Sequence, residues 1–425
     1  MRKTLLILSL VCIGIFFLPQ LATTGLGKKF FNRALSQRFH ASASIQDIHL
    51  SWLGPQSFQH ISLTSPHMVG HIDELKSDVF FWKLGAVGSD FHIKDGSFTF
   101  PSQGNASLKN ISAEVHGHNL LAQGDALPSG HFILTGKLFS EQDFDLTFDL
   151  KEIPTPALDQ LINHPNSLTN LLGNTLDASG ALVLNTSSGH LTLELSSPNL
   201  HTSFRSQLDA THLLLTHPLQ LFFHPPQITT KQPILLTIDP EGFQLPWRSF
   251  SLDKVLIPHA TLDIGQIQLP TKRNLSTLIS LFKDFQRSST TDIWCAPVPL
   301  SLDSGILHVG RLDALVSRVI HTCLWGKINC INHRLDLTLG LTADTLVYSF
   351  GIQGLSRSYV LKIPLQGTLE NPELDTTTAA AKIAALLALE GLPQIPQLGK
   401  LGKVLKNVPK PQEDQTDVPP PARGF

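Results

Sequence analysis

The stretch Asp143–Leu150, "DFDLTFDL", decides the fold of this chain, because apolar and polar residues alternate in it without a break. Successive side chains of a β-strand point to opposite faces, so this period of two predicts a strand with one apolar and one polar face. The apolar face carries Phe144, Leu146, Phe148 and Leu150. Such a face has to be covered by another layer of protein, a ligand or a partner.

The same alternation recurs along the chain, with Gly, Asn, Pro and Ser between the segments. Clear examples are 190–195, 334–341, 345–350 and 361–367. We count about twenty such segments between residues 41 and 370, which is typical of antiparallel meanders in a mainly β protein. A closed sandwich would bury two apolar faces against each other. An open, curved sheet would instead leave one long apolar groove, and the period alone is compatible with both.

Four segments have helical rather than strand periodicity: 28–39, 154–172, 273–287 and 375–390. The last is predicted to begin at the capping residue Asp375 and to stop at Gly391. It is nearly apolar all round and too short to span a bilayer unaided, so we expect it to be buried in the protein or inserted at an interface.

The N-terminus carries the one long apolar run, Thr4–Leu21, with no charged residue in it. A run of this length is about what a transmembrane helix needs, and we expect an uncleaved, single-pass anchor with its short basic end in the cytoplasm. A cleaved secretory signal is the alternative. The helix that follows carries basic and aromatic residues suited to a membrane surface; a helix that caps the first sheet is the compatible alternative. These residues are Lys28, Lys29, Phe30, Phe31, Arg33 and Arg38.

Composition excludes several function classes. Net charge is −2 and no basic block exceeds two residues, which argues against nucleic-acid binding. The sequence contains no phosphate loop, nucleophile elbow, dinucleotide fingerprint or zinc-protease motif. The pair His116 and His118 has no third ligand at a defined spacing and is better explained as part of a solvated face. We therefore expect no enzyme activity, no catalytic residue, no cofactor and no metal.

Cysteine is too sparse for a disulfide framework. A two-residue turn at Gly326–Lys327 would place Cys323 opposite Cys330 across a hairpin, within bridging distance. The sequence is compatible with a disulfide between Cys323 and Cys330 and with two half-buried thiols.

Two regions resemble the AsmA-like family of envelope proteins, which are relatives of TamB and of chorein-type bridge-like lipid carriers. The first is the anchor followed by 34–66, where a helix leads into two strands, although His40 and Ala41 stand where the family usually has a glycine. The second is 302–346 followed by 359–375, with Gly and Ile in a strand at 326 and 328 and "LDL" at 335–337. The closing signature is similar at Leu365, Gly367, Thr368, Leu369 and Pro372.

The resemblance implies an inner-membrane protein whose body lies in the periplasm as a long, twisted antiparallel sheet with an open apolar groove. It implies a role in lipid transport and envelope biogenesis, with phospholipid or another acyl lipid, the inner membrane and an envelope protein as partners. Apolar strand residues would then line the lipid groove: Phe144, Leu146, Phe148, Leu150, Leu191, Leu193, Leu195, Leu335, Leu337 and Leu339. A tethered β-sandwich scaffold that binds another envelope protein is the alternative function.

These features predict six successive regions. They are a membrane anchor (1–27), a helix and β sheet (28–152), a middle β region with two helices (153–290), a C-terminal β region (291–374), a helical segment (375–408) and a disordered tail (409–425).

Overall fold

The protein is mainly β, with antiparallel strands and few helices. The computed structural model describes residues 23–39, 41–52, 54–65, 69–80, 90–99, 107–127, 129–140, 143–156, 159, 167–186, 188–225, 229–247, 251–270, 290–369, 371–389 and 415–422. The chain divides into two compact units, Met1–Ala210 (unit 1) and Thr211–Phe425 (unit 2). Their border lies inside the region that we expected to run from 153 to 290.

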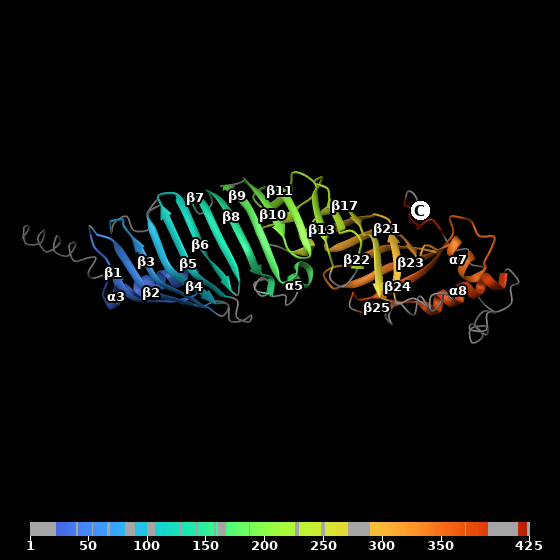
Figure 1. The fold of residues 1–425 in the computed structure, drawn as a ribbon, viewed down its shortest axis with the longest axis horizontal. Coiled ribbons are helices and arrows are strands. Elements are labelled where there is room, and N and C mark those ends of the chain that lie inside the picture. The colour runs from blue at the N-terminus through green and yellow to red at the C-terminus, as the bar shows by residue number, and fades with distance from the viewer. Residues whose placement is uncertain are drawn as a thin grey trace, which may run out of the picture. The chain divides into compact units, whose positions relative to one another are not determined.

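Unit 1 is an eleven-strand meander in which each strand pairs with the one before it and the one after it (Figure 1). Its strands are β1 (Ser42–His49), β2 (Gln56–Thr64), β3 (Val69–Ser77), β4 (Phe91–Thr99), β5 (Ser107–His116), β6 (Asn119–Leu127), β7 (Gly130–Ser140), β8 (Asp143–Pro154), β9 (Thr175–Asn185), β10 (Ser188–Ser196) and β11 (Leu200–Leu208). All ten pairings are antiparallel, so the alternation in each strand presents the same two faces across the whole sheet.

Helix α3 (Gly25–Phe39) closes the first edge of this sheet. The amides of Ala43 and Ile45 on β1 donate to Ser36 Oγ (2.9 Å) and Asn32 Oδ1 (3.0 Å) of the helix. An unpaired edge strand is a template for aggregation, and these side chains occupy two of its donors. Phe31 and Leu35 of α3 also pack on the buried apolar side chains of β1 and β2. The predicted sheet-capping helix is therefore present.

Unit 2 has its own antiparallel strands, many of which are shorter than those of unit 1. They are β12 (His212–Leu215), β13 (Leu219–Phe223), β14 (Thr229–Thr230), β15 (Ile234–Ile238), β16 (Leu245–Pro246), β17 (Ile257–Asp263), β18 (Gly265–Pro270), β19 (Thr290–Cys295), β20 (Val298–Asp303), β21 (Ile306–Val316), β22 (Ile320–Asn329), β23 (Arg334–Thr342), β24 (Val360–Gly367) and β25 (Pro372–Leu374). Strand β18 follows β17 and pairs with β19, and β17 pairs with β20, which follows β19. One register irregularity lies between Ile257 and Ala260 of β17.

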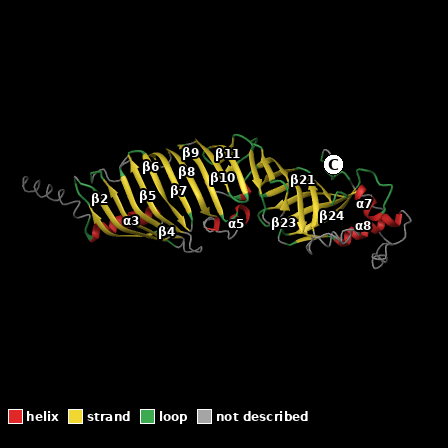
Figure 2. Ribbon diagram, viewed as in Figure 1, coloured by secondary structure: helices red, strands yellow, loops and turns green. Residues whose placement is uncertain are grey.

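Two helices cover one face of β22–β24 in unit 2, α7 (Ala343–Phe350) and α8 (Thr376–Leu389) (Figure 2). Their core contains Leu341, Leu361 and Ile363, each 0% exposed. Asp375 caps α8 as predicted, because its carboxylate accepts hydrogen bonds from the amide (2.9 Å) and hydroxyl (2.6 Å) of Thr378. These bonds hold the pKa of Asp375 below its ordinary value.

The predicted strand at 345–350 is wrong, because these residues form most of α7. Leu346 and Phe350 are four residues apart and both face the core of α7 and α8, so three alternating apolar residues were compatible with either period. The helix ends at Gly351, whose φ of 75° gives the left-handed C-terminal cap that its amide completes by bonding back into the last turn.

The predicted hairpin at Gly326–Lys327 is also wrong. Strand β22 runs through both residues, and Cys323 lies opposite Asp313 and Gly340 on the neighbouring strands. Cys330 follows the same strand seven residues later, which is roughly 23 Å at ~3.3 Å per residue. Both thiols are free, and no bridge between them fits a strand.

The expected disordered tail contains a docked segment. Residues 415–422 lie against unit 2, where Val418 packs on Cys323, Trp325 and Val360. A segment rich in proline has no apolar period, so the pattern could not reveal a contact that depends on a distant part of the chain.

Other predicted elements lie outside the described residues. These are the anchor at Thr4–Leu21, the helix at 273–287, and residues 157–158 and 160–166 of the helix at 154–172, whose last part is α5 (Ser167–Leu172). Among the helices that are described, none combines the length and apolarity that crossing a bilayer requires.

Candidate functional site

One row of apolar residues crosses all eleven strands of unit 1. The row is defined by the strand register, in which each member lies directly opposite the next. Its members are Ile48, Phe58, Leu75, Ile93, Ala113, Ala122, Leu134, Phe148, Gly180, Leu193 and Phe204. Residues directly opposite each other in a sheet share a face, so the row forms one continuous apolar band, which we call the apolar row.

The apolar row is covered at one end and open along the rest. Under α3, Ile48 is 3% exposed and Phe58 is 6% exposed. From β4 to β11 every member is only half-buried, including Leu134, Phe148 and Leu193. Side chains this apolar are normally buried in a protein core. The described structure therefore leaves a long apolar surface with room for further apolar contact.

A second row runs beside the first and has the same character. Across β4–β10 it consists of Phe91, Val115, Leu120, Gly136, Leu146, Leu182 and Leu191. Two glycines let aromatic rings lie close to the sheet on this face. A Cβ at Gly124 would stand 2.8 Å from the ring of Phe132, and one at Gly180 would stand 3.0 Å from the ring of Phe148. Each ring therefore lies over a neighbouring strand's glycine.

The open part of this face is large enough for acyl chains. Seven strand spacings of ~4.8 Å separate β4 from β11, about 34 Å in all. The hydrocarbon core of a bilayer, ~30 Å thick, contains two opposed layers of acyl chains, so one chain is about 15 Å long. The band could thus hold acyl chains in succession or several side by side.

The opposite face of unit 1 is polar. Thr135 and Thr147 pair through their hydroxyls (2.6 Å), and Lys151 lies 3.5 Å from Asp149 and 4.0 Å from Asp177. These carboxylates are spread along strands in contact with solvent. Exposed ion pairs of this kind contribute little stability and provide no pair of carboxyl groups in unlike environments for acid–base chemistry.

The predicted groove residues fall into two sets. Phe144, Leu146, Phe148 and Leu150 on β8 and Leu191, Leu193 and Leu195 on β10 are half-buried and share the face of the apolar row. Leu335 and Leu337 on β23 are buried, and Leu339 packs against the core beneath α7 and α8. The structure therefore brings the first set together on an accessible surface, whereas helices cover the strand that carries the second set.

The predicted membrane-surface residues lie on α3, and their side chains differ in exposure. Phe30 is 70% exposed, and Lys29 and Arg33 are exposed. Phe31 instead packs on Phe58, with ring centroids 5.4 Å apart, and Lys28 lies 3.6 Å from Asp47 of β1. The side chain of Arg38 lies outside the described residues. Lys29, Phe30 and Arg33 are thus exposed on α3, while Phe31 packs the helix against the sheet.

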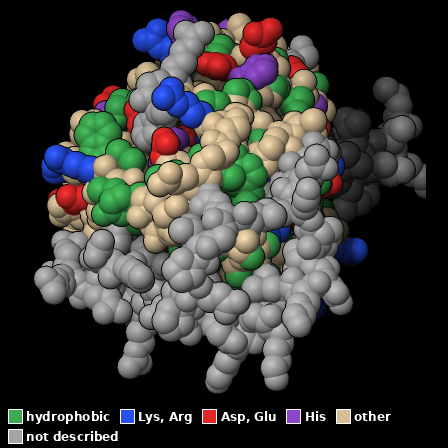
Figure 3. All heavy atoms as spheres, turned by 90° about the vertical axis from the view of Figure 1, so that its right-hand side faces the viewer, with side chains coloured by type: hydrophobic (Ala, Val, Ile, Leu, Met, Phe, Trp, Pro, Cys, Tyr) green, Lys and Arg blue, Asp and Glu red, His purple; other side chains and the backbone are tan. Residues whose placement is uncertain are grey.

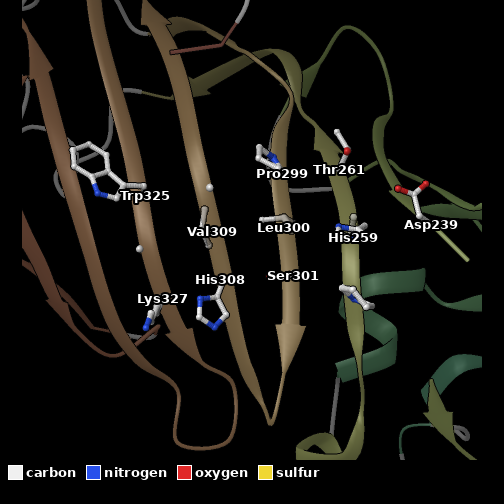
Figure 4. Close-up of a pocket in the computed structure, with 14 residues that line it drawn as sticks. Asp239, His259, Thr261, Pro299, Leu300, Ser301, His308, Val309, Trp325 and Lys327 are labelled. Atoms are coloured by element: carbon white, nitrogen blue, oxygen red, sulfur yellow. The ribbon is translucent and has the colours of Figure 1, made fainter. Parts of the chain in front are cut away.

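Unit 2 carries a pocket of about 570 Å³, lined by Asp239 and by residues of β17, β20, β21 and β22 (Figure 4). His308 and Lys327 lie side by side in it on neighbouring strands, with Trp325 beyond them and Asp239 on the far wall. Hydrophobic side chains on the surface of the molecule in Figure 3 lie in small groups among polar ones, as is usual for a protein surface. Apolar side chains such as Pro299, Leu300 and Trp325 line the pocket together with polar ones.

A buried charged cluster in unit 2 was missed from the sequence. Arg311 donates to Asp313 through Nε (3.0 Å), and Nη2 lies 2.9 Å from the same oxygen. His321 Nε2 also lies 2.9 Å from it. Burial alone would raise the pKa of Asp313, but hydrogen bonds from His321, the amide of Ala422 and Arg311 hold that pKa below its ordinary value. "GRLDAL" resembles any polar strand face, because the segment that buries these charges comes about 100 residues later.

Comparison of the chain with protein-family models, with curated proteins and with solved structures gives no match.

Proposed function

We propose that the protein is a membrane-anchored, non-enzymatic lipid carrier or shield of the AsmA-like kind, which holds phospholipid acyl chains on the open apolar face of unit 1. In this scheme residues 4–21 anchor the chain in the inner membrane and the two units lie in the periplasm. Lys29, Phe30 and Arg33 would hold α3, and with it the first strands, at the membrane surface.

The apolar row is the observation that carries this proposal. Eleven strands place an apolar residue at the same register position, yet only the end under α3 is fully buried. Each acyl methylene that leaves water for this face would contribute ~0.8 kcal/mol. Binding would depend on chain length more than on headgroup chemistry, since the adjoining rows also consist mainly of aliphatic and aromatic residues.

A closed β-sandwich scaffold is the alternative that the sequence left open. A sandwich needs a second sheet over the apolar face. All eleven described strands of unit 1 belong to one meander that pairs in chain order, so no described strand of that unit remains to form the second sheet. This arrangement favours the carrier over the scaffold.

Photolabelling tests the carrier. The full chain would be reconstituted in phospholipid vesicles that contain a photoreactive acyl chain, and the labelled residues would be mapped by mass spectrometry. We expect labels on β7–β10 at the apolar row. Phe148→Glu should reduce them about tenfold, because a carboxylate would have to be buried against hydrocarbon without a partner.

Thr147→Glu is the matched control, since it adds the same charge one residue away on the exposed polar face of β8. Labelling of 4–21 in the same sample reports whether the anchor enters the bilayer, so failure of the anchor and failure of the apolar face can be told apart. Equal labelling of the two variants on β7–β10, with the fold intact, would rule out this face as the lipid site.

A further inference from the structure

The docked C-terminal segment, residues 415–422, makes contacts at three places on one face of β21–β24. At its start, the side chain of Gln415 bonds to the backbone of Val360, accepting from the amide (3.1 Å) and donating to the carbonyl (3.3 Å). In the middle, Val418 packs on the apolar group formed by Cys323, Trp325 and Val360. At its end, the segment reaches the buried charged cluster.

The charged cluster is completed by the backbone of this segment. Arg311 Nη1 donates to the carbonyl of Pro419 (2.9 Å), and the amide of Ala422 donates to Asp313 Oδ2 (2.8 Å). Arg311 and His321 already bond to the other oxygen, Oδ1. Side chains of the sheet therefore bond to Oδ1 of Asp313, whereas the backbone of the segment bonds to Oδ2 of Asp313 and to Nη1 of Arg311. Asp313 is 0% exposed, and a buried acceptor left without its donor is costly.

The sequence of the segment explains how its register is set. Prolines have no N–H, so the run Pro419–Pro421 offers carbonyls but no donor, and Ala422 provides the first amide after Val418. Asp313 Oδ2 can accept from the backbone only at the end of this run. Fixed proline φ angles also reduce the conformational entropy lost when an extended segment binds. The hydrophobic residue thus packs on Trp325, a carbonyl of the proline run accepts from Arg311, and the amide that follows the run donates to Asp313.

We propose that this face of β21–β24 is a peptide-binding site for segments of that pattern, and that residues 415–422 are a separable ligand that the chain itself provides. Trp325 lines the pocket of unit 2 as well as contacting Val418. Val418 of the bound segment therefore contacts a residue of the pocket wall, and release of the segment would expose Trp325 and the charged cluster. This site is distinct from the apolar row and does not depend on lipid binding.

A labelled peptide tests whether the segment is separable. The probe is a fluorescent peptide with the native sequence of residues 411–425, titrated against two full-length chains, the native one and Val418→Asp, by fluorescence anisotropy. In the variant the chain's own segment binds the site more weakly, because a carboxylate takes the place of the Val418 side chain that packs on Cys323, Trp325 and Val360. We expect the peptide to bind Val418→Asp at least tenfold more tightly than the native chain, in which the site is occupied.

Matched variants identify the contacts. A Val418→Asp peptide should not bind, whereas a Thr416→Ser peptide, changed at an exposed position, should bind like the native one. Arg311→Gln, added to the Val418→Asp chain, should abolish binding, and Arg334→Gln at an exposed position of β23 should not. Equal binding of the peptide to the native and Val418→Asp chains, or to neither, would overturn the proposal. Loss of hydrogen-exchange protection throughout β22–β24 in Val418→Asp would overturn it too, since the segment would then be part of the core of unit 2.

Discussion

The sheets of unit 1 and unit 2 use the same alternation of apolar and polar residues, but they leave their apolar faces in different states. On β8 and β10 of unit 1, Phe148 and Leu193 are half-buried. On β23 and β24 of unit 2, Leu341 and Leu361 are 0% exposed. The chemical character of the side chains is the same, so the difference lies in what covers them.

The length of the connections explains this difference. From β5 to β8 and from β9 to β10 the strands are joined by two residues, and β10 is joined to β11 by three. Such turns provide no material for a second layer, and the longer connection between β8 and β9 contains only the short helix α5 among its described residues. In unit 2, the connections after β23 and β25 contain α7 and α8, which fold back over the sheet. Alternation therefore determines which face is apolar, and the connections determine whether the protein covers it.

The comparison can be tested first by truncating one leucine on each face. Leu361→Ala should lower the free energy of unfolding by about 2–5 kcal/mol, as expected for a fully buried leucine. Leu146→Ala should cost only about 1 kcal/mol, because part of its surface is already in contact with water. Urea unfolding followed by hydrogen exchange in β24 and β8 peptides would separate the two units. Equal losses would mean that the face of unit 1 is as fully covered as that of unit 2.

The covered end of the apolar row can be opened deliberately. Phe31→Ala removes the ring that packs on Phe58, and it should destabilise the α3 end by about 2 kcal/mol, somewhat less than a fully buried phenylalanine. It should also increase binding of an apolar fluorescent dye, since Ile48 and Phe58 would join the open surface. Phe30→Ala is the control, because Phe30 is 70% exposed. A dye signal that rises equally in both variants would show that α3 does not cover the row through Phe31.

The strand pattern could be predicted from the sequence because it depends on neighbouring residues only. The predicted strands at 143–150, 190–195, 334–341 and 361–367 correspond to β8, β10, β23 and β24. The seven groove residues on β8 and β10 also share one face, which follows from alternation once the strands pair in chain order. What the pattern could not give is the register that aligns eleven residues into one row, because register depends on turn lengths and partners.

Errors arose where a distant segment or a second period decides the structure. At 345–350 a helix and a strand fit the same three apolar residues, and the cap at Gly351 selects the helix. At Gly326–Lys327 a turn signal lies inside β22, where pairing with both β21 and β23 keeps the strand extended. Arg311 and Asp313 are buried and bond to residues 415–422, which come about 100 residues later in the chain. The last two cases require tertiary contacts that sequence periodicity does not contain.

The smallest expected effect is a change in the reactivity of Cys323. This thiol lies on the face of unit 2 that the C-terminal segment contacts. Burial raises the pKa of the Cys323 thiol to about 11, and desolvation likewise raises that of Cys295 to about 11. At pH 8 only ~0.1% of such a thiol is the reactive thiolate, and the fraction grows about tenfold per pH unit. We expect alkylation at pH 8, followed by mass spectrometry, to modify the half-buried Cys330 well before Cys323. Val418→Asp should accelerate modification of Cys323 but not of Cys295, which serves as the internal control. If Cys323 reacts as quickly as Cys330 in the native chain, the segment does not protect this face, and the covered surfaces of unit 2 would be limited to the one beneath α7 and α8.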